Sequence, residues 1–370
     1  MDGGRELTLE GKLNQASLRE RIQKMLAGQR GDGPWVVEMD PTTVCNLACH
    51  DCISANLLHH GMFDRERIKQ IAAEFVQLGV KAVVLIGGGE PMAHPEFGTI
   101  STFFADNGIH LGLTTNGTLI DRHLELLAER FKWVRVSVDA GTNDTFQAFR
   151  PTANGRSLFD QVIANMRALG RIKTGKLGYS FLVLSKTAPD GSVIQSNVDD
   201  IPAAARLAKD IGCDYFEVKP SFDMMHFLID HSQAVHQVVA DHLRSINHLE
   251  DEHFKIISPY TLAEVLDGAS TQPKPYTRCL VSELRTVVAP SGVYVCPYHR
   301  GNLNMSMGDA NKNTFSYIWT GERRTTVMKR VNPSIHCTFH CIRHRSNLLL
   351  EKWAAEGMPA ESIDDYDFFI

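Results

Sequence analysis

The sequence lacks the long apolar runs that secretion or a membrane span requires. It opens MDGGRELTLEGKLNQ, which has no apolar core of a signal peptide. No later segment approaches the roughly 18 consecutive apolar residues of a membrane-spanning helix. Basic residues are not in excess either, because 38 Lys and Arg stand against 43 Asp and Glu. These absences predict a cytoplasmic protein without a membrane or a nucleic acid as partner.

Cysteine, in contrast, is well represented. The eight cysteines are Cys45, Cys49, Cys52, Cys213, Cys279, Cys296, Cys337 and Cys341. Because the cytosol keeps thiols reduced, their short spacings indicate metal or redox chemistry rather than disulfide bonds.

A regular alternation of apolar runs and amphipathic segments begins at Trp35. Strands are expected over 35–40, 82–86, 110–115, 133–139, 176–184 and 215–219. Helices are expected near 15–28, 64–78, 94–107, 120–130, 158–169, 198–211 and 340–355. Continuously apolar strands separated by helices predict an α/β fold with a parallel sheet. A (β/α)6 partial TIM barrel is the first expectation and an open doubly wound sheet the alternative.

The same alternation of strands and helices predicts the domain boundaries. Residues 1–34 read as an N-terminal arm with one helix, 35–221 as the partial barrel, and 222–370 as a small C-terminal module. In a parallel α/β fold the functional loops lie beyond the C-terminal ends of the strands. The sequence motifs should therefore follow the expected strands, as they do.

The first cysteine group stands directly after the first strand, in DPTTVCNLACHDC. Three thiolates on one tight loop suit an iron–sulfur cluster, and three ligands for four irons leave one iron open for catalysis. Zinc is the competing interpretation, with His50, His59 or His60 as the fourth ligand.

The spacing Cys-x3-Cys-x2-Cys after the first strand of a βα barrel resembles the signature of the radical S-adenosylmethionine (SAM) superfamily. The resemblance implies a 4Fe–4S cluster on Cys45, Cys49 and Cys52 whose open iron binds SAM. It also implies that an electron from the cluster cleaves SAM, and that the resulting 5′-deoxyadenosyl radical removes a hydrogen atom from the substrate. A flavodoxin- or ferredoxin-type protein would supply the electron.

Further motifs follow later strands in the order that this resemblance implies. After the second strand, VVLIGGGEP resembles the family's SAM-binding motif, with Gly87, Gly88, Gly89, Glu90 and Pro91. Asn116 lies in TTNGT after the third strand, and Ser137 and Asp139 in VSVDAG after the fourth. We expect Ser137, Asp139 and Arg150 to bind the ribose or carboxylate of SAM, whereas the bland alternative is that Ser137 and Asp139 cap the next helix. Lys219 and Pro220 are weaker candidates for a place near the adenine.

The second cysteine group occupies the C-terminal module. A hairpin around 290–292 would bring Cys279 and Cys296 together, and a helix start would put Cys337 and Cys341 on one face. Four thiolates suit a fully ligated 4Fe–4S cluster, with structural zinc as the alternative. The group resembles the SPASM and twitch auxiliary-cluster modules, although Gly292 and Cys296 have three residues between them where those modules have four.

Cys213 belongs to neither group. It reads as a small buried residue, and the sharper hypothesis is a thiol that donates a hydrogen atom to a substrate radical. Asp223, His226, Tyr298, His299 and Arg300 are candidates for substrate binding or proton removal.

The predicted function is radical oxidation of a small polar molecule. The resemblance to single-auxiliary-cluster enzymes implies a sugar, aminocyclitol or sugar nucleoside of antibiotic biosynthesis, with a C–OH oxidised to a ketone. A redox-neutral epimerase or decarboxylase and a peptide-modifying SPASM maturase are the alternatives. The maturase stands second because only about 34 residues precede the first strand, too few for a leader-peptide domain. A barrel that merely binds zinc and a ligand would leave the GGGEP and VSVDAG loops unexplained.

Overall fold

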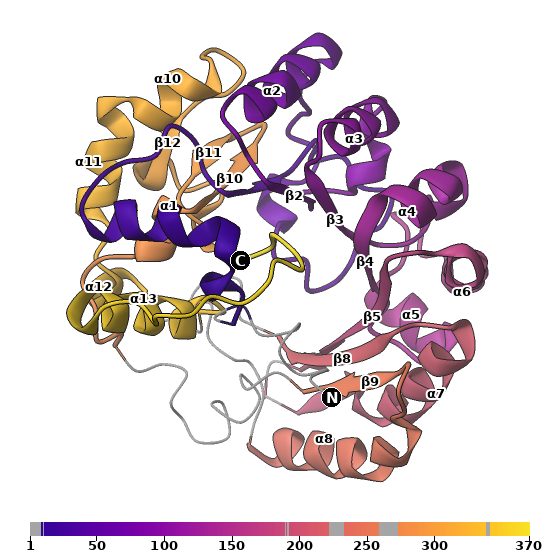
Figure 1. Ribbon diagram of the computed structural model, residues 1–370. Coiled ribbons are helices and arrows are strands. Elements are labelled where there is room, and N and C mark those ends of the chain that lie inside the picture. Colours follow the sequence, from indigo (N-terminus) through magenta and orange to yellow (C-terminus); the bar gives the residue numbers. More distant parts are fainter. Residues whose placement is uncertain are drawn as a thin grey trace.

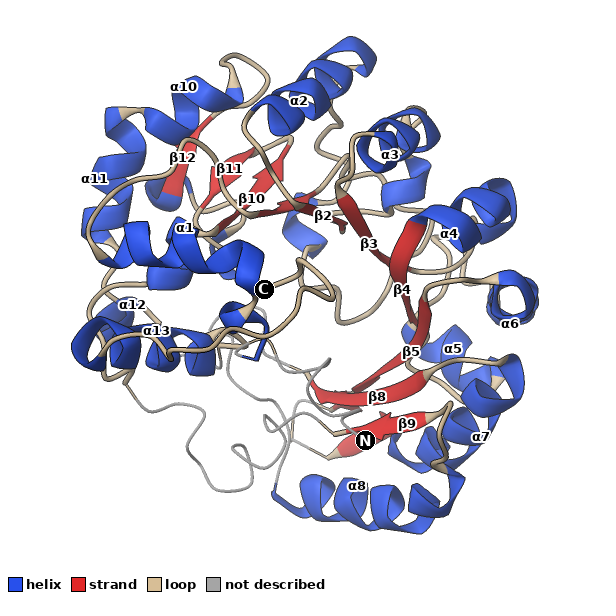
Figure 2. Ribbon diagram, viewed as in Figure 1, coloured by secondary structure: helices blue, strands red, loops and turns tan. Residues whose placement is uncertain are grey.

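One curved sheet of ten strands organises the described part of the chain, and helices cover its outer side (Figures 1 and 2). The computed structural model describes residue 9 and residues 11–188, 190, 192–221, 233–258, 273–337 and 341–370. The strand order is β12-β11-β10-β1-β2-β3-β4-β5-β8-β9. Every pairing from β10 to β9 along this order is parallel, and only β10–β11 and β11–β12 are antiparallel.

The central strands follow the predicted runs closely. They are β1 (Val36–Met39), β2 (Ala82–Leu85), β3 (His110–Thr115), β4 (Phe131–Ser137), β5 (Lys176–Val183), β8 (Tyr215–Pro220) and β9 (Lys255–Ile257). The C-terminal strands are β10 (Arg285–Ala289), β11 (Gly292–Tyr294) and β12 (Ser306–Gly308). A separate two-stranded sheet pairs β6 (Ser185–Thr187) with β7 (Val193–Ser196).

The helices begin and end at recognisable signals. Asp64 caps α2 by accepting hydrogen bonds from Glu66 N and Arg67 N, and Gly212, with φ +88°, ends α7. Between the strands lie α2 (Arg65–Gln77), α3 (Phe97–Asp106), α4 (Leu124–Arg130), α5 (Asn143–Phe149), α6 (Phe159–Ile172), α7 (Ile201–Ile211) and α8 (Gln233–Ile246). The others are α1 (Ala16–Leu26), α10 (Phe315–Thr320), α11 (Glu322–Arg330), α12 (Pro333–His336) and α13 (His344–Glu356).

Two hydrophobic clusters lie on opposite faces of the sheet. Alternate strand residues such as Val136 and Phe181 pack outward with helix residues such as Met166 and Ala208 in the main core. A second cluster joins α1, α13 and the last residues of the chain to the inner side of β1 and β2. There the ring of His110 stacks on Phe368 with centroids 4.3 Å apart. The C-terminal residues thus lie inside the curve of the sheet, against its central strands (Figure 1).

The predicted α/β partial barrel is confirmed. The sequence did not reveal α5, the β6–β7 hairpin, or the joining of the C-terminal strands to the barrel sheet through β10 and β1. The predicted boundary between 221 and 222 adjoins residues 222–232, outside the described part, so the domain limits stay predictions. Among the described residues, no helix is both long and apolar enough to cross a membrane.

Candidate functional site

The loop that carries Cys45, Cys49 and Cys52 follows β1 and is anchored on two sides. On one side Thr43 N donates to Gly61 O (2.9 Å), and the Thr43 hydroxyl donates to the same oxygen (2.7 Å). On the other side His50 N donates to Phe149 O at 3.0 Å, next to α5. The backbone positions of the three cysteines are therefore fixed by neighbouring loops.

Burial disfavours the thiolate forms of Cys45 and Cys49. It raises the pKa of Cys45, and it raises the pKa of Cys49 to about 11. A thiol of that kind is deprotonated by binding a cation, since a coordinated metal stabilises the thiolate. A side-chain amide also lies nearby, with Asn116 Nδ2 at 3.8 Å from Cys45 Sγ.

The glycine turn after β2 packs directly against the cysteine loop. A Cβ atom on Gly89 would lie 2.3 Å from Val44 O, so only glycine fits there. Glu90 N then donates to Val44 O at 2.8 Å. Gly88 and Gly89 thus pack against Thr43 and Val44, directly before Cys45.

Glu90 is buried and joins the second loop to the third. Its carboxylate accepts hydrogen bonds from Thr115 Oγ1 (2.7 Å), Asn116 N (2.8 Å) and Met92 N (3.2 Å). Burial raises the pKa of Glu90, although these donors oppose the shift. Asn116 continues the network, because its Nδ2 donates to Asn46 Oδ1 at 2.9 Å, within the cysteine loop.

Asp139 and Arg150 form a buried ion pair beside the cysteines. Arg150 Nη1 lies 2.5 Å from Asp139 Oδ2, and Asp139 Oδ1 accepts from Leu182 N at 2.8 Å. Burial lowers the pKa of Arg150, but Cys49 and Asp139 outweigh it and raise the pKa overall. Asp139 has a φ of +56°, a sparsely populated conformation for a non-glycine residue. Such conformations cluster at functional sites.

The helix-capping alternative for Ser137 and Asp139 is wrong. The first helix after β4 is α5, and Thr142 caps it by accepting from Thr145 N. Ser137 ends β4 and pairs in register with Ser180 of β5. Both lie at the C-terminal end of the sheet, where Ser137 is partly exposed and the Asp139 carboxylate is buried in its ion pair with Arg150.

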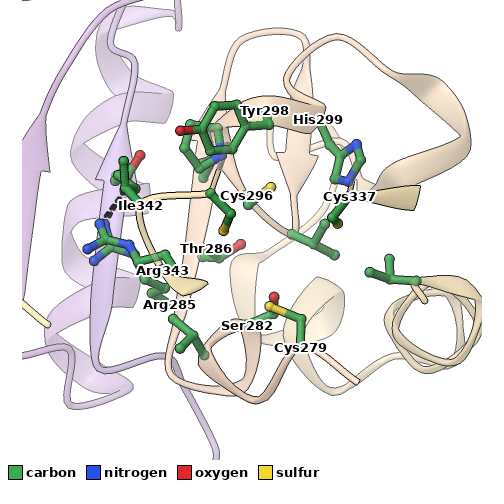
Figure 3. A pocket seen from close by; sticks show the side chains of 17 residues that line it. Cys279, Ser282, Arg285, Thr286, Cys296, Tyr298, His299, Cys337, Ile342 and Arg343 are labelled. Atoms are coloured by element: carbon green, nitrogen blue, oxygen red, sulfur yellow. Dashed lines mark hydrogen bonds and ion pairs between the residues drawn. The ribbon is translucent and has the colours of Figure 1, made fainter. Parts of the chain in front are cut away.

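The four C-terminal cysteines line a single pocket. Cys279, Cys296, Cys337 and Cys341 all contribute to it, together with Tyr298 and His299 (Figure 3). The predicted hairpin is confirmed, since β10 and β11 pair around 290–291 and Cys296 follows β11. Burial, followed by the charges of the other three cysteines, raises the pKa of Cys296. Burial also raises the pKa of Cys337 to about 12 and that of Cys341 to about 11, so a bound cation would favour their thiolate forms.

The expected helix face for Cys337 and Cys341 is wrong. Cys337 comes immediately after α12, and Cys341 stands three residues before α13. The two cysteines therefore do not share one helix face. Residues 338–340 lie outside the described part.

Ion pairs join the second cysteine pocket to the first site. Arg300, on the loop after Cys296, faces Asp40 with Nε–Oδ2 at 2.6 Å and Nη2–Oδ1 at 3.0 Å. Arg343, two residues after Cys341, reaches Glu38 at 3.4 Å, and Arg285 also pairs with Glu38. The sequence marked Arg300 as a substrate contact and overlooked Glu38 and Asp40. A charged residue inside the apolar run WVVEMD was the signal that a buried partner existed.

The remaining candidates are scattered. Cys213 is buried at the N-terminal side of β8, the opposite end of the strands from the Cys45 loop, which does not favour its role as hydrogen donor. Tyr298 and His299 line the second pocket, and burial lowers the pKa of His299 to about 4. Lys219 and Pro220 end β8. Asp223 and His226 lie outside the described residues.

Both cysteine groups fit iron–sulfur clusters in their donor chemistry. Within the described ranges, no three Cys, His, Asp or Glu side chains are grouped closely enough for a single metal ion. In a cluster each thiolate binds a different iron, so the sulfur atoms stand farther apart than around one zinc ion. The glycine turn packs against the backbone before Cys45, and the Glu90 network ties the third loop to it.

Comparison with known proteins agrees with this geometry. The model of the radical SAM superfamily matches residues 39–196. The AdoMet-dependent heme synthase of Methanosarcina barkeri is 25% identical over 191 residues, which are 50% of this chain and 50% of that protein. The mycofactocin maturase MftC of Mycobacterium tuberculosis is 29% identical over 145 residues, 38% of this chain and 36% of that protein. The chain spans half or less of the length of these relatives.

Solved structures resemble the whole fold more broadly. SuiB of Streptococcus suis, bound to its precursor peptide SuiA, gives a TM-score of 0.61 at 14% identity and covers 85% of this chain and 70% of SuiB. The enzyme anSMEcpe with bound AdoMet gives 0.59 at 16% identity, covering 87% of this chain and 93% of its own. At these identities the likeness concerns the fold alone.

Proposed function

We propose that this chain, which belongs to the radical SAM superfamily, is an enzyme with two iron–sulfur clusters that modifies a peptide. The observation that carries the first part is the meeting of three loops. Cys45, Cys49 and Cys52 lie on the first loop, Gly89 packs against that loop, and Glu90 bonds the third loop. When bound, the cluster and SAM supply a reductive cleavage whose radical product removes a hydrogen atom from the substrate.

The residues of this chain hold and orient that cofactor. Cys45, Cys49 and Cys52 would bind three irons and leave the fourth for SAM. The backbone around Gly88 and Gly89 and the buried Glu90 shape the side of the site where the amino group of SAM would lie. Ser137, Asp139 and Arg150 offer hydroxyl, carboxylate and guanidinium groups for its ribose and carboxylate.

The second pocket would hold an auxiliary 4Fe–4S cluster on Cys279, Cys296, Cys337 and Cys341. Four thiols that line one pocket suit the complete ligation of such a cluster. Such a cluster would accept the electron left on the substrate radical, and a flavodoxin- or ferredoxin-type partner would reduce the first cluster.

Peptide modification, the second choice on sequence grounds, is the substrate class we put first. It is supported by SuiB, solved with its precursor peptide, and by anSMEcpe, which was also solved with the peptide Kp18Cys. Oxidation of a small polar molecule is the second candidate, and the polar inner face of β4 and β8 favours it.

Metal counts and SAM cleavage test the two clusters together. After anaerobic reconstitution we expect roughly eight irons per chain, falling to about four in the Cys45/Cys49/Cys52→Ala triple variant. Cys45→Ala should abolish 5′-deoxyadenosine formation under dithionite. Cys279→Ala should keep part of it but stop product formation. About four irons with one zinc in the wild type would refute the auxiliary cluster, and 5′-deoxyadenosine from Cys45→Ala would refute the first.

Substrate class is tested by mass spectrometry. Wild-type enzyme is incubated with short peptides encoded near its gene and, separately, with a panel of aminocyclitols and sugar nucleosides. A mass change in a peptide that depends on SAM and on Cys279 supports the maturase. Turnover of the small molecules alone would reverse the order of the two candidates.

A further inference from the structure

A group of charged side chains lines the inner face of the sheet, on β4 and β8. Parallel pairing places Arg135 beside Gly178 and Tyr215, and Ser137 beside Ser180 and Glu217. The alternate residues Val134, Val136, Tyr179 and Val218 pack outward in the main core. Arg135, Glu217 and Lys219 therefore face the inside of the barrel, where a substrate would enter.

Two cations there share one carboxylate oxygen. Arg135 Nε and Lys219 Nζ each lie 3.3 Å from Glu217 Oε2. The set carries a net positive charge, because only one negative charge faces the two positive ones. The Arg135 and Lys219 side chains are 33% and 27% exposed, whereas Glu217 is 13% exposed. The cations are thus accessible while their carboxylate partner is covered.

The contacts of Arg135 fix its Nε and the plane of its guanidinium group, but not its two Nη atoms. Its Nε also approaches Tyr215 Oη at 3.4 Å, and its guanidinium lies over the Trp133 ring, 5.6 Å from the centroid. Gly178 leaves space for the Tyr215 ring beside Arg135, because a Cβ at Gly178 would lie 2.1 Å from that ring. Within the described part of the chain, neither Nη atom of Arg135 is hydrogen-bonded to protein. A planar fork with two open donors suits bidentate binding of an anion.

The charge balance around Lys219 also favours the binding of an anion. Burial lowers its pKa, and Glu217 offsets the shift only in part. An anion bound beside Lys219 would supply the missing negative charge. Arg135 lies deeper than Ser137 by two residues, roughly 7 Å along β4, whereas the strand register places Glu217 level with Ser137 and Lys219 beside Leu182.

We propose that Arg135 and Lys219 bind an anionic group of the substrate, a carboxylate or a phosphate, and so orient the rest of the substrate toward the Cys45 site. This inference rests on the proposed function in one respect, that the anion belongs to the substrate of a radical SAM enzyme. Glu217 and Tyr215 are positioning residues that hold the two cations on the inner face.

Calorimetric titration of the reconstituted holoenzyme with two probes, succinate and inorganic phosphate, tests the proposal. Ionic strength is held constant with chloride, because screening would otherwise vary. We expect one probe to bind the wild type, and Arg135→Gln and Lys219→Gln each to weaken it by about tenfold or more. Arg130→Gln is the matched control, since Arg130 pairs with Asp106 on the exposed outer side and should not change binding. The tighter probe identifies the anion as carboxylate or phosphate.

The proposal is overturned if neither probe binds, or if both variants bind as tightly as the Arg130→Gln control. Arg135→Lys keeps the charge without the fork and provides a second variant should Arg135→Gln fail to fold. Iron content and 5′-deoxyadenosine are measured in the same wild-type preparation. Anion binding without 5′-deoxyadenosine would refute the proposed function and leave the anion site standing, whereas the reverse result would refute the anion site alone.

Discussion

At the scale of single residues, Glu90 has the most connected position in the cofactor site. Its two carboxylate oxygens accept three hydrogen bonds, from Thr115, Asn116 and Met92. Through Asn116 the same network reaches Asn46 in the cysteine loop. One buried carboxylate thus holds the loops after β2 and β3 against the loop after β1.

Glu90→Gln should weaken SAM binding while leaving the iron in place. The glutamine NH2 group would face one of the N–H or O–H donors that now point at the carboxylate, which leaves a buried donor unsatisfied at a cost of about 1–3 kcal/mol. We expect the dissociation constant for SAM to rise by about tenfold or more, measured by equilibrium dialysis. Glu129→Gln, on the exposed side of α4, is the control. Unchanged SAM affinity would show that Glu90 only supports the loop.

At the scale of elements, the turn after β2 depends on close backbone approach. Gly89 touches the carbonyl of Val44, and a Cβ at Gly87 would lie 1.7 Å from Gly89 O. Both glycines are required by space and not by a positive φ. The turn can therefore press against the cysteine loop only if it carries no side chains.

Gly89→Ala should displace the cysteine loop and reduce cluster assembly. A Cβ at 2.3 Å from a backbone oxygen forces the two loops apart. We expect clearly less iron per chain after reconstitution and a weaker absorbance band of the cluster. Gly98→Ala in α3 is a matched control, because its Cβ would meet only His123 at 3.7 Å and alanine favours a helix. Equal iron content in the two variants would contradict the close-packing argument.

At the scale of the whole molecule, Asp40 connects the two cysteine sites. Asp40 comes directly after β1. Its Oδ2 would lie 3.4 Å from a Cβ at Gly88, and the same carboxylate pairs with Arg300 of the C-terminal region. Burial raises the pKa of Asp40 to about 7, although Arg300 opposes the shift. The folded protein holds this proton more tightly than the unfolded chain does. The contribution of Asp40 to the free energy of unfolding therefore falls as the pH rises from about 4 to about 7.

Arg300→Gln should therefore destabilise the protein more at pH 8 than at pH 5.5. Without Arg300 the pKa of Asp40 rises further, so an unpaired buried carboxylate must ionise above pH 7, at a cost of up to about 3–5 kcal/mol. At pH 5.5 Asp40 is largely protonated in both proteins, and the difference shrinks. The measurement is the Tm of the holoprotein at the two pH values. The Asp40→Asn/Arg300→Gln double variant should remove this pH dependence, and an equal Tm loss at both pH values would disprove the role of Asp40.

The sequence by itself determined the cofactor site, because the motifs are local. Cys45, Cys49 and Cys52 share one loop, and the glycine turn and VSVDAG each follow a strand whose apolar run is visible. Parallel strands bring their C-terminal ends together, so the order of motifs along the chain was enough to predict that they meet. The strand periodicity also predicted the partial barrel.

Only the tertiary structure decided what lies between distant segments. The joining of β10 to β1, the approach of Arg300 to Asp40 across 260 residues, and the inward-facing set of Arg135, Glu217 and Lys219 depend on register and curvature, which no local pattern encodes. Cys337 and Cys341 were predicted to share a helix face, but one follows α12 and the other precedes α13. Charges buried inside apolar strands are the trace that such contacts leave in a sequence, and their partners appear only once the chain has folded.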